Sequence, residues 1–182
     1  MVRHRTAQEL RDAIPHIVAS PRNNGTVEMI VTRPDKGLRE IHESCRLTRS
    51  EGVDGDHWAK GCWLSTDDGA PHPDVAVCIM NSRCIDLIAG TRDRWALAGD
   101  NLFVDMNLSE ENLPVGQRLV LGRAEIEITA VPHAGCQKFI DRFGRDACVF
   151  VNTTKHERLR GVYARVIRDG KVSQGDTLRK SP

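Results

Sequence analysis

The residues with the clearest chemical potential lie around Cys136, where a strand-like stretch gives way to a helix-like one. A cysteine at the start of a helix meets the positive end of the helix dipole and free backbone amides, which favour the thiolate. His133 and Lys138 are close to it in sequence. A thiolate is a nucleophile and a metal ligand, although most free cysteines are simply buried. His133 and Cys136 together supply two ligands, fewer than the four of an ordinary structural zinc site.

Two polar turns are further candidates. The segment GVDGDH, residues 52–57, places Asp54, Asp56 and His57 beside glycines, which suits either a metal site or a tight turn. The segment AGDNL puts Asn101 directly before an apolar stretch, and an asparagine in a turn can also satisfy neighbouring backbone groups. Both turns therefore keep a structural and a functional interpretation.

Length, charge and cysteine spacing narrow the class of protein. With 182 residues the chain is long enough for one domain with its own core, and a formal net charge of +1 leaves no broad basic surface for nucleic acid. The apolar run over residues 75–80 is far shorter than the ~20 residues that span a bilayer. The six cysteines form no C-x-x-C pair, and the first residues lack the apolar core of a secretory leader. We therefore expect free thiols in a cytoplasmic protein.

The chain is predicted to begin with a short helix. Thr6 and Glu9 have the spacing of a capping box, apolar residues follow at helical spacing, and Pro15 limits or kinks the helix. A turn-rich linker over residues 20–25 comes next. Residues 1–25 are therefore expected to form a helix and linker ahead of a main domain over residues 26–182.

The elements that would position the candidate residues are mostly short strands. Alternating apolar residues and apolar runs predict strands over residues 27–32, 75–80, 119–121 and 124–130, the last two joined as a hairpin. Short helices are expected after residue 80 and over residues 136–143, the second ended by Gly144. Residues 161–172 are predicted to form another hairpin, with Asp169 and Gly170 in its turn. Many short strands with glycine-rich turns predict a mainly β fold, a barrel or a folded-over sheet with a few short helices.

Taken in order along the chain, these motifs resemble the MOSC domain, the C-terminal module of molybdenum cofactor sulfurases, in its stand-alone bacterial form. The family pattern contains a G-x-x-G-D loop, a G-[ED]-N-[IL] turn, a G-x-x-[IL]-x-[IL]-G hairpin start, a key cysteine and a closing segment that ends in G-D. Those positions are filled here by residues 52–57, 99–102, 116–122, Cys136 and residues 161–176. The resemblance covers nearly the whole chain and implies a mainly β, barrel-like fold.

The resemblance also implies site residues. In this family the molybdenum of the cofactor is held by the pterin dithiolene and by the protein cysteine, which corresponds to Cys136. Asn101 corresponds to the asparagine beside the cofactor. The other cofactor-binding candidates are Asp56 and His57 of the first loop, His133 near the cysteine, and Arg33 and Lys36 after the first strand, where basic residues meet the cofactor phosphate.

Three functions follow from this resemblance. The first is a component of a molybdenum-dependent reductase that acts on small N-hydroxylated compounds with electrons from a separate protein. The second is a metal-free sulfur carrier in which Cys136 takes a persulfide from a separate cysteine desulfurase, since no pyridoxal phosphate domain is present in this sequence. The third is a non-enzymatic binding module, suggested by His57 where the family often has Arg and by Gly135 where it often has Pro. None of the three involves nucleic acid or a membrane.

Overall fold

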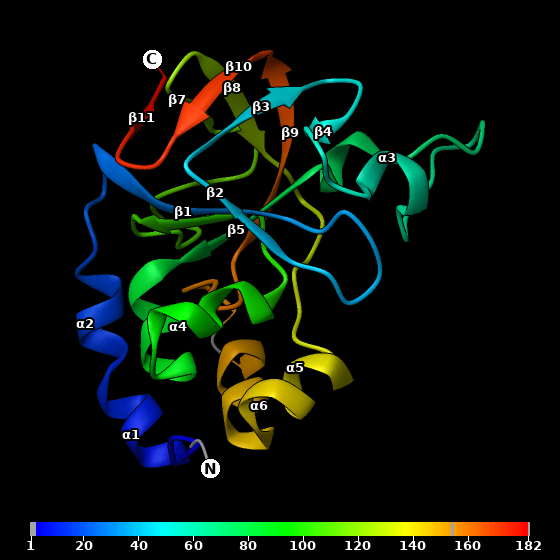
Figure 1. Ribbon diagram of the computed structural model, residues 1–182. Helices are drawn as coiled ribbons and strands as arrows, with labels where there is room; N and C mark the ends of the chain where they lie inside the picture. The colour runs from blue at the N-terminus through cyan, green and yellow to red at the C-terminus, as the bar shows by residue number, and fades with distance from the viewer. Residues whose placement is uncertain (1–2, 154, 182) are drawn as a thin grey trace.

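The computed structural model describes residues 3–153 and 155–181, and a closed β-barrel forms its upper half in Figure 1. Pairing of β11 with β1 closes the barrel, and β2 (Glu40–His42) extends the sheet beyond β1. In spatial order the barrel strands are β11 (Thr177–Lys180), β7 (Arg118–Leu121), β8 (Ala124–Ile128), β9 (Val162–Arg168), β5 (Val77–Asn81), β6 (Leu102–Asp105) and β1 (Gly25–Thr32). The predicted mainly β, barrel-like fold with a few short helices is confirmed.

The predicted hairpin of β7 and β8 shows how the sequence pattern builds the barrel. Ala124, Ile126 and Ile128 are fully buried, whereas Glu125 and Glu127 on the opposite face of β8 remain partly exposed. Side chains alternate between the two faces of a strand, so this period of two separates barrel interior from solvent.

The parallel pair β5 and β6 carries the loop that holds Asn101. The two strands are joined by α4 (Ser82–Ala89) and the 3₁₀ helix η2 (Arg92–Ala98). The strand expected from residue 75 begins at Val77, because η1 (Pro73–Val75) precedes it. After η2, the backbone N–H of Asn101 donates to the carbonyl oxygen of Cys78 at 2.9 Å, which fixes the 99–101 turn against β5.

A second, three-stranded sheet consists of β3 (Ser44–Thr48), β4 (Gly52–Val53) and β10 (Gly170–Ser173). The predicted hairpin over residues 161–172 is wrong, because β10 pairs with β3 whereas β9 pairs with β5 and β8. A two-residue D-G hairpin turn of type I′ needs positive φ at both central residues, and neither Asp169 nor Gly170 has it. A Cβ on Gly170 would collide with the backbone of Arg123 and Ala124, so the chain passes closely over the β7–β8 turn on its way to the second sheet.

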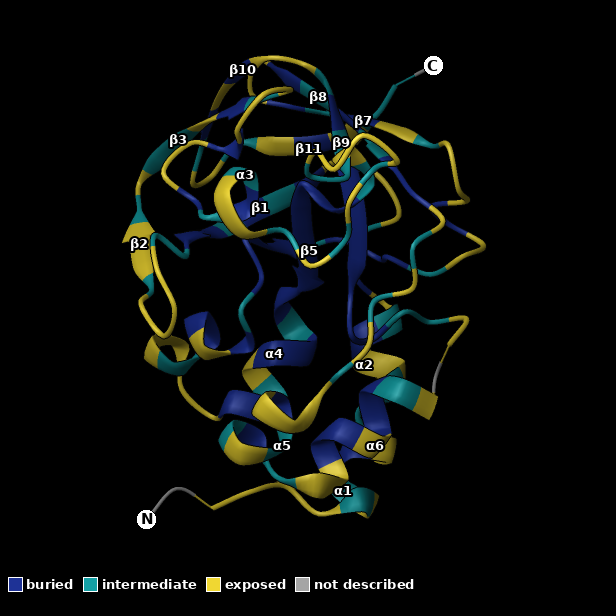
Figure 2. Cartoon of the chain, turned by 90° about the vertical axis from the view of Figure 1, so that its right-hand side faces the viewer, coloured by how far each residue is buried: buried dark blue, intermediate teal, exposed yellow. Residues whose placement is uncertain are grey.

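The helices gather at one end of the barrel (Figure 1). They are α1 (Ala7–Asp12), α2 (Ile14–Val18), α4, α5 (Gln137–Phe143) and α6 (Arg145–Thr153), while α3 (Trp58–Gly61) lies beside the second sheet. One apolar core fills the barrel, and a second, which includes Phe103, Phe139 and Phe143, lies between the barrel and the helices. Figure 2 shows β5 and parts of α4 in the dark blue of buried residues. Among the described residues no helix has the length and apolar character needed to cross a membrane.

The N-terminal helix begins as predicted. The Thr6 hydroxyl accepts from the Glu9 N–H, and the Glu9 carboxylate accepts from the Thr6 N–H, which completes the capping box. The helix is interrupted at Ala13, and Pro15 lies in the first turn of α2, where it requires no N–H partner. Leu10 and Ile17 are buried in the helix-side core, so both short helices pack against the rest of the protein.

Candidate functional site

Cys136 is the N-cap residue of α5 and is exposed. The loop that brings it there from β8 is held by Asn152 of α6, whose side chain accepts from the Gly135 N–H at 2.7 Å and donates to the Gly135 carbonyl at 3.1 Å. A Cβ at position 135 would lie 3.0 Å from Cys148 Sγ, so glycine lets this loop pack closely against α6. The thiol is therefore presented at the surface on a backbone that is fixed on both sides.

The other five cysteines are packed to a greater degree. Cys78, Cys84 and Cys148 are buried, Cys45 and Cys62 are partly buried, and all six cysteines are free. Burial raises the pKa of the Cys78 thiol to about 11 and that of the Cys84 thiol to about 12. These thiols remain protonated at neutral pH, and Cys136 is left as the accessible one.

Buried Asp56 and Asn101 form, with the partly buried Arg33, a group that we call the closed cluster. The Asp56 carboxylate accepts from the backbone N–H of Arg33 (2.8 Å), from its Nε (2.9 Å) and from its Nη2 (2.9 Å). It also accepts from the backbone N–H of Trp58 and from Nδ2 of Asn101. Burial favours the neutral acid, but the hydrogen bonds and the positive charge of Arg33 outweigh it and lower the pKa of Asp56.

The closed cluster leaves no polar group free for a ligand. Arg33 also donates through Nη1 to the Gly99 carbonyl at 3.0 Å and through Nη2 to Asn101 Oδ1 at 3.3 Å. Asn101 is fully buried, its Oδ1 accepts from the Cys78 N–H, and its Nδ2 donates to the Val31 carbonyl and to Asp56. These side chains therefore tie together three loops from distant parts of the chain.

The metal interpretation of the 52–57 loop finds no support in the structure. Within the described residues, no group of three or more His, Cys, Asp and Glu side chains could hold a metal ion. The Asp56 carboxylate is hydrogen-bonded to Arg33, and Asp54 is exposed. The loop is a turn whose buried carboxylate organises its neighbours.

Asp100, His133 and Arg160 form a second buried group, which we call the open cluster. Arg160 Nη1 donates to Asp100 Oδ2 at 2.7 Å, and its Nη2 donates to the Ala98 carbonyl at 3.1 Å. His133 Nδ1 lies 3.6 Å from Asp100 Oδ1, too far for a hydrogen bond. These two atoms and Arg160 Nε are buried without a partner among the described residues. Burial, with the charges of Arg160 and Arg33, holds the pKa of His133 well below its ordinary value, so the ring is neutral at pH 7.

Cations line a pocket of about 440 Å³ between the loop after β1 and α5. We call it the basic pocket and define it by Lys36, Arg39, His57, Lys138 and Arg142. Its two carboxylates are used locally, since Asp35 accepts from the backbone N–H of Lys36 and Asp141 from the side chain of Gln137. Burial and the nearby charges of Arg142 and Arg33 lower the pKa of Arg39, whose Nε is buried with no partner in the described part of the chain. Four formal cations face two carboxylates in this lining, so the pocket keeps an excess of positive charge.

The structure divides the site residues expected from sequence into three places. Lys36 and His57 line the basic pocket, which reaches Lys138, two residues beyond Cys136. Arg33, Asp56 and Asn101 lie in the closed cluster, and His133 lies in the open cluster. Asn101 does not line an open pocket beside the cysteine.

Two cations of the basic pocket, Arg39 and Arg142, are missing from the sequence-based candidates. Arg39 follows Lys36 in the same loop. Arg142 follows Lys138 by four residues, so Lys138 and Arg142 lie on one face of α5. Helical spacing could have identified Arg142. Nothing local in the sequence indicates that α5 faces the loop after β1.

The profile of the MOSC domain family matches residues 66–179, which is more than half of the chain and includes Cys136. The chain belongs to the MOSC domain family. In this MOSC protein the closed cluster combines Asn101, inside the matched region, with Arg33 and Asp56, which precede it. No curated protein sequence matches the chain.

Solved structures share the fold of this MOSC protein. YiiM from Escherichia coli is 24% identical with a TM-score of 0.55, and the alignment covers 88% of this chain and 69% of that one. The YUAD protein from Bacillus subtilis is 16% identical with a TM-score of 0.60, covering 85% of this chain and 94% of that one. YiiM from Geobacillus stearothermophilus is 16% identical with a TM-score of 0.56, covering 87% and 75%. At these identities the likeness establishes the fold alone.

Proposed function

We propose that this MOSC protein binds the molybdenum cofactor, with the Cys136 thiolate as metal ligand and the basic pocket as the site of the cofactor phosphate. The observation that carries the proposal is the combination of an exposed thiol on a hydrogen-bonded loop with a pocket in which cations outnumber carboxylates. Lys138 links the two features, because it follows Cys136 by two residues and lines the basic pocket.

The side chains present fit this group. A thiolate is a soft ligand of the kind that holds transition metals, and guanidinium groups pair with phosphate through parallel hydrogen bonds. The buried Nε of Arg39 has no acceptor among the described residues, and burial with the nearby charges of Arg142 and Arg33 lowers the pKa of this side chain. His57 Nδ1 lies 2.9 Å from the Arg33 carbonyl, which fixes the ring at the edge of the pocket. A phosphate would supply an acceptor for Arg39 Nε and would balance the excess positive charge of the basic pocket.

Each part of the site would have a separate task. When bound, the cofactor supplies two-electron redox chemistry, which suits a component of a reductase that removes oxygen from small N-hydroxylated compounds. Cys136 would hold the metal, and Arg39, Lys138 and Arg142 would neutralise the phosphate. The closed cluster would keep the loop after β1 in place through the contacts of Asp56 with Arg33. A separate protein would deliver the electrons.

Molybdenum and pterin content test this assignment. We expect the protein, produced with active cofactor synthesis, to carry both, and expect Cys136→Ser to lose the metal. Cys62→Ser is the matched control, since Cys62 is a partly buried thiol beside the barrel core. Arg39→Gln should retain less pterin, while Arg46→Gln, at an exposed position on β3, should retain it. Equal metal in Cys136→Ser and Cys62→Ser would overturn the assignment.

A sulfur carrier is the second candidate, and the exposure of Cys136 favours it. In that reaction the Cys136 thiolate attacks the terminal sulfur of a persulfide on a separate cysteine desulfurase. The desulfurase cysteine leaves as a thiolate, and Cys136 becomes the persulfide. Mass spectrometry after incubation with a desulfurase and free cysteine should then show an adduct of about 32 Da on Cys136, which is the mass of one sulfur atom. An adduct elsewhere, or none, would exclude the carrier, and absence of both metal and adduct would leave a binding module.

A further inference from the structure

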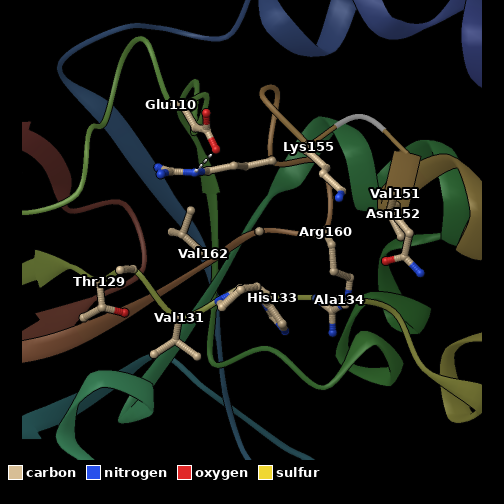
Figure 3. A pocket seen from close by; sticks show the side chains of 14 residues that line it. Glu110, Thr129, Val131, His133, Ala134, Val151, Asn152, Lys155, Arg160 and Val162 are labelled. Carbon is tan, nitrogen blue, oxygen red and sulfur yellow. Dashed lines mark ion pairs between the residues drawn. The ribbon is translucent and has the colours of Figure 1, made fainter.

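A separate pocket of about 340 Å³ lies beside the Cys136 loop and shares no lining residue with the basic pocket. We call it the loop pocket. It lies between the segment after β8, the end of α6 and the segment that enters β9. Figure 3 shows Glu110 and Lys155 at one rim and Val131, His133 and Ala134 at the opposite one. Val131, Ala134, Val151 and Val162 contribute the main apolar side chains of its walls.

Among the charged side chains that line the loop pocket, one cation has no carboxylate partner in the described residues. Glu110 accepts from His156 Nδ1 at 2.9 Å and lies 3.9 Å from Arg158 Nε, so its charge is compensated. Arg160 is paired with Asp100. Lys155 lines the pocket, and its backbone carbonyl accepts from the Arg158 N–H, but its side-chain ammonium has no ion-pair or hydrogen-bond partner among the described residues.

Two polar atoms near the loop pocket also lack partners. Arg160 and His133 line it with side chains that are only 8% and 6% exposed, and Arg160 Nε and His133 Nδ1 have no hydrogen bond in the described structure. Buried polar groups in folded proteins nearly always have a hydrogen-bond partner, so these two unpartnered atoms indicate a bound ligand or water molecule. The two guanidinium nitrogens of Arg160 other than Nε already donate to Asp100 and Ala98.

We propose that the loop pocket binds a small organic monocarboxylate. Its carboxylate would lie between Lys155 and the Nε–H of Arg160, and its short apolar body would contact Val131, Val151 and Val162. The volume is at the small end of ligand pockets, and one unpaired cation with few free donors suits a monoanion better than a phosphate dianion. This site does not depend on the proposed molybdenum chemistry.

Calorimetric titration of the full chain with benzoate and with its neutral isostere benzamide tests the proposal. We expect saturable binding of benzoate, at least tenfold weaker binding of benzamide, and no competition from inorganic phosphate. Lys155→Gln, at an exposed position, should weaken benzoate binding about tenfold, the loss of one charge-assisted contact. Lys138→Gln in the basic pocket is the matched control and should leave it unchanged.

Two further variants separate this site from the cofactor site. Ala134→Phe places a ring in the loop pocket from an exposed position and should abolish benzoate binding while the fold, followed by circular dichroism, is kept. Cys136→Ser should bind benzoate as the wild type does, whatever its metal content. Equal affinity for benzoate and benzamide, unchanged affinity in Lys155→Gln, or no saturable binding would overturn the proposal and assign the unpaired atoms to water.

Discussion

The closed cluster and the open cluster are built from the same kinds of residue and differ in how completely they are satisfied. Both pair an arginine of low exposure with a carboxylate that has no exposed side-chain surface. They also share one turn, since Asp100 belongs to the open cluster and the next residue, Asn101, to the closed one. In the closed cluster Asp56 receives five hydrogen bonds. In the open cluster Asp100 receives one from Arg160, and three polar atoms have no partner in the described residues.

This difference separates scaffold from site. A buried polar network in which every member is satisfied makes the fold rigid, whereas unsatisfied members keep a capacity to bind. The closed cluster connects β1, the 52–57 loop and the 99–101 turn, and so it supports the basic pocket without facing it. The open cluster lies behind the Cys136 loop and borders the loop pocket. Resemblance to the family marks all three residues of the closed cluster and only His133 of the open cluster, and it is their hydrogen bonds that separate scaffold from site.

Removing the carboxylate of the closed cluster should have the largest effect. Asp56→Ala leaves the largely buried Arg33 guanidinium without its carboxylate partner, and breaking a buried pair from one side costs about 3–5 kcal/mol of unfolding free energy. Asp54→Ala, at an exposed position two residues away, should change it by less than about 0.5 kcal/mol. Urea denaturation measures both. A loss below about 1 kcal/mol in Asp56→Ala would show that the closed cluster is not a scaffold.

An asparagine substitution in the open cluster should cost less than the same substitution in the closed cluster. Asp100→Asn keeps an oxygen for Arg160 and loses mainly the charge of one hydrogen bond, which we expect to cost about 1.5–3 kcal/mol by urea denaturation. The isosteric Asp56→Asn is the matched comparison, because it alters a carboxylate with five donors. If the two asparagine variants were equally unstable, the distinction between the clusters would fail.

The two clusters should also respond to acid in different pH ranges. The pKa of His133 is lowered by burial and by Arg160, so below its ordinary pKa of 6.5 the unfolded chain binds a proton that the folded chain does not. The contribution of His133 to stability should therefore begin to fall as the pH drops below 6.5, by at most about 1.4 kcal/mol per pH unit. Burial raises the pKa of Asp100 in the same cluster, and this group acts with the opposite sign. The lowered pKa of Asp56 acts later, below its ordinary value of 3.8.

Replacing His133 isolates its own contribution to the pH dependence of stability. His133→Gln should flatten the dependence of unfolding free energy on pH between about 6.5 and 5, while the acid transition that involves Asp56 remains. Urea midpoints across this range provide the measurement. An unchanged slope in His133→Gln would mean that the ring is not held neutral in the fold.

The barrel and the position of Cys136 could be predicted because the signals are local. The alternation in β8, the capping box of α1 and the glycine that ends α5 each require only neighbouring residues. The partners of Arg33 could not be predicted in this way, because Asp56 is 23 residues away and Asn101 is 68 residues away. The predicted D-G hairpin failed for the same reason, since the pairing of β10 with β3 is decided by distant strands.

Metal content of the purified protein tests the central claim most directly. Molybdenum should be measured by inductively coupled plasma mass spectrometry, and pterin by fluorescence, in the wild type, Cys136→Ser and Cys62→Ser produced side by side with active cofactor synthesis. We predict molybdenum in the wild type and in Cys62→Ser, and its loss in Cys136→Ser with the fold retained. Absence of molybdenum from the wild type, or its retention in Cys136→Ser, would contradict a cofactor held by this thiol.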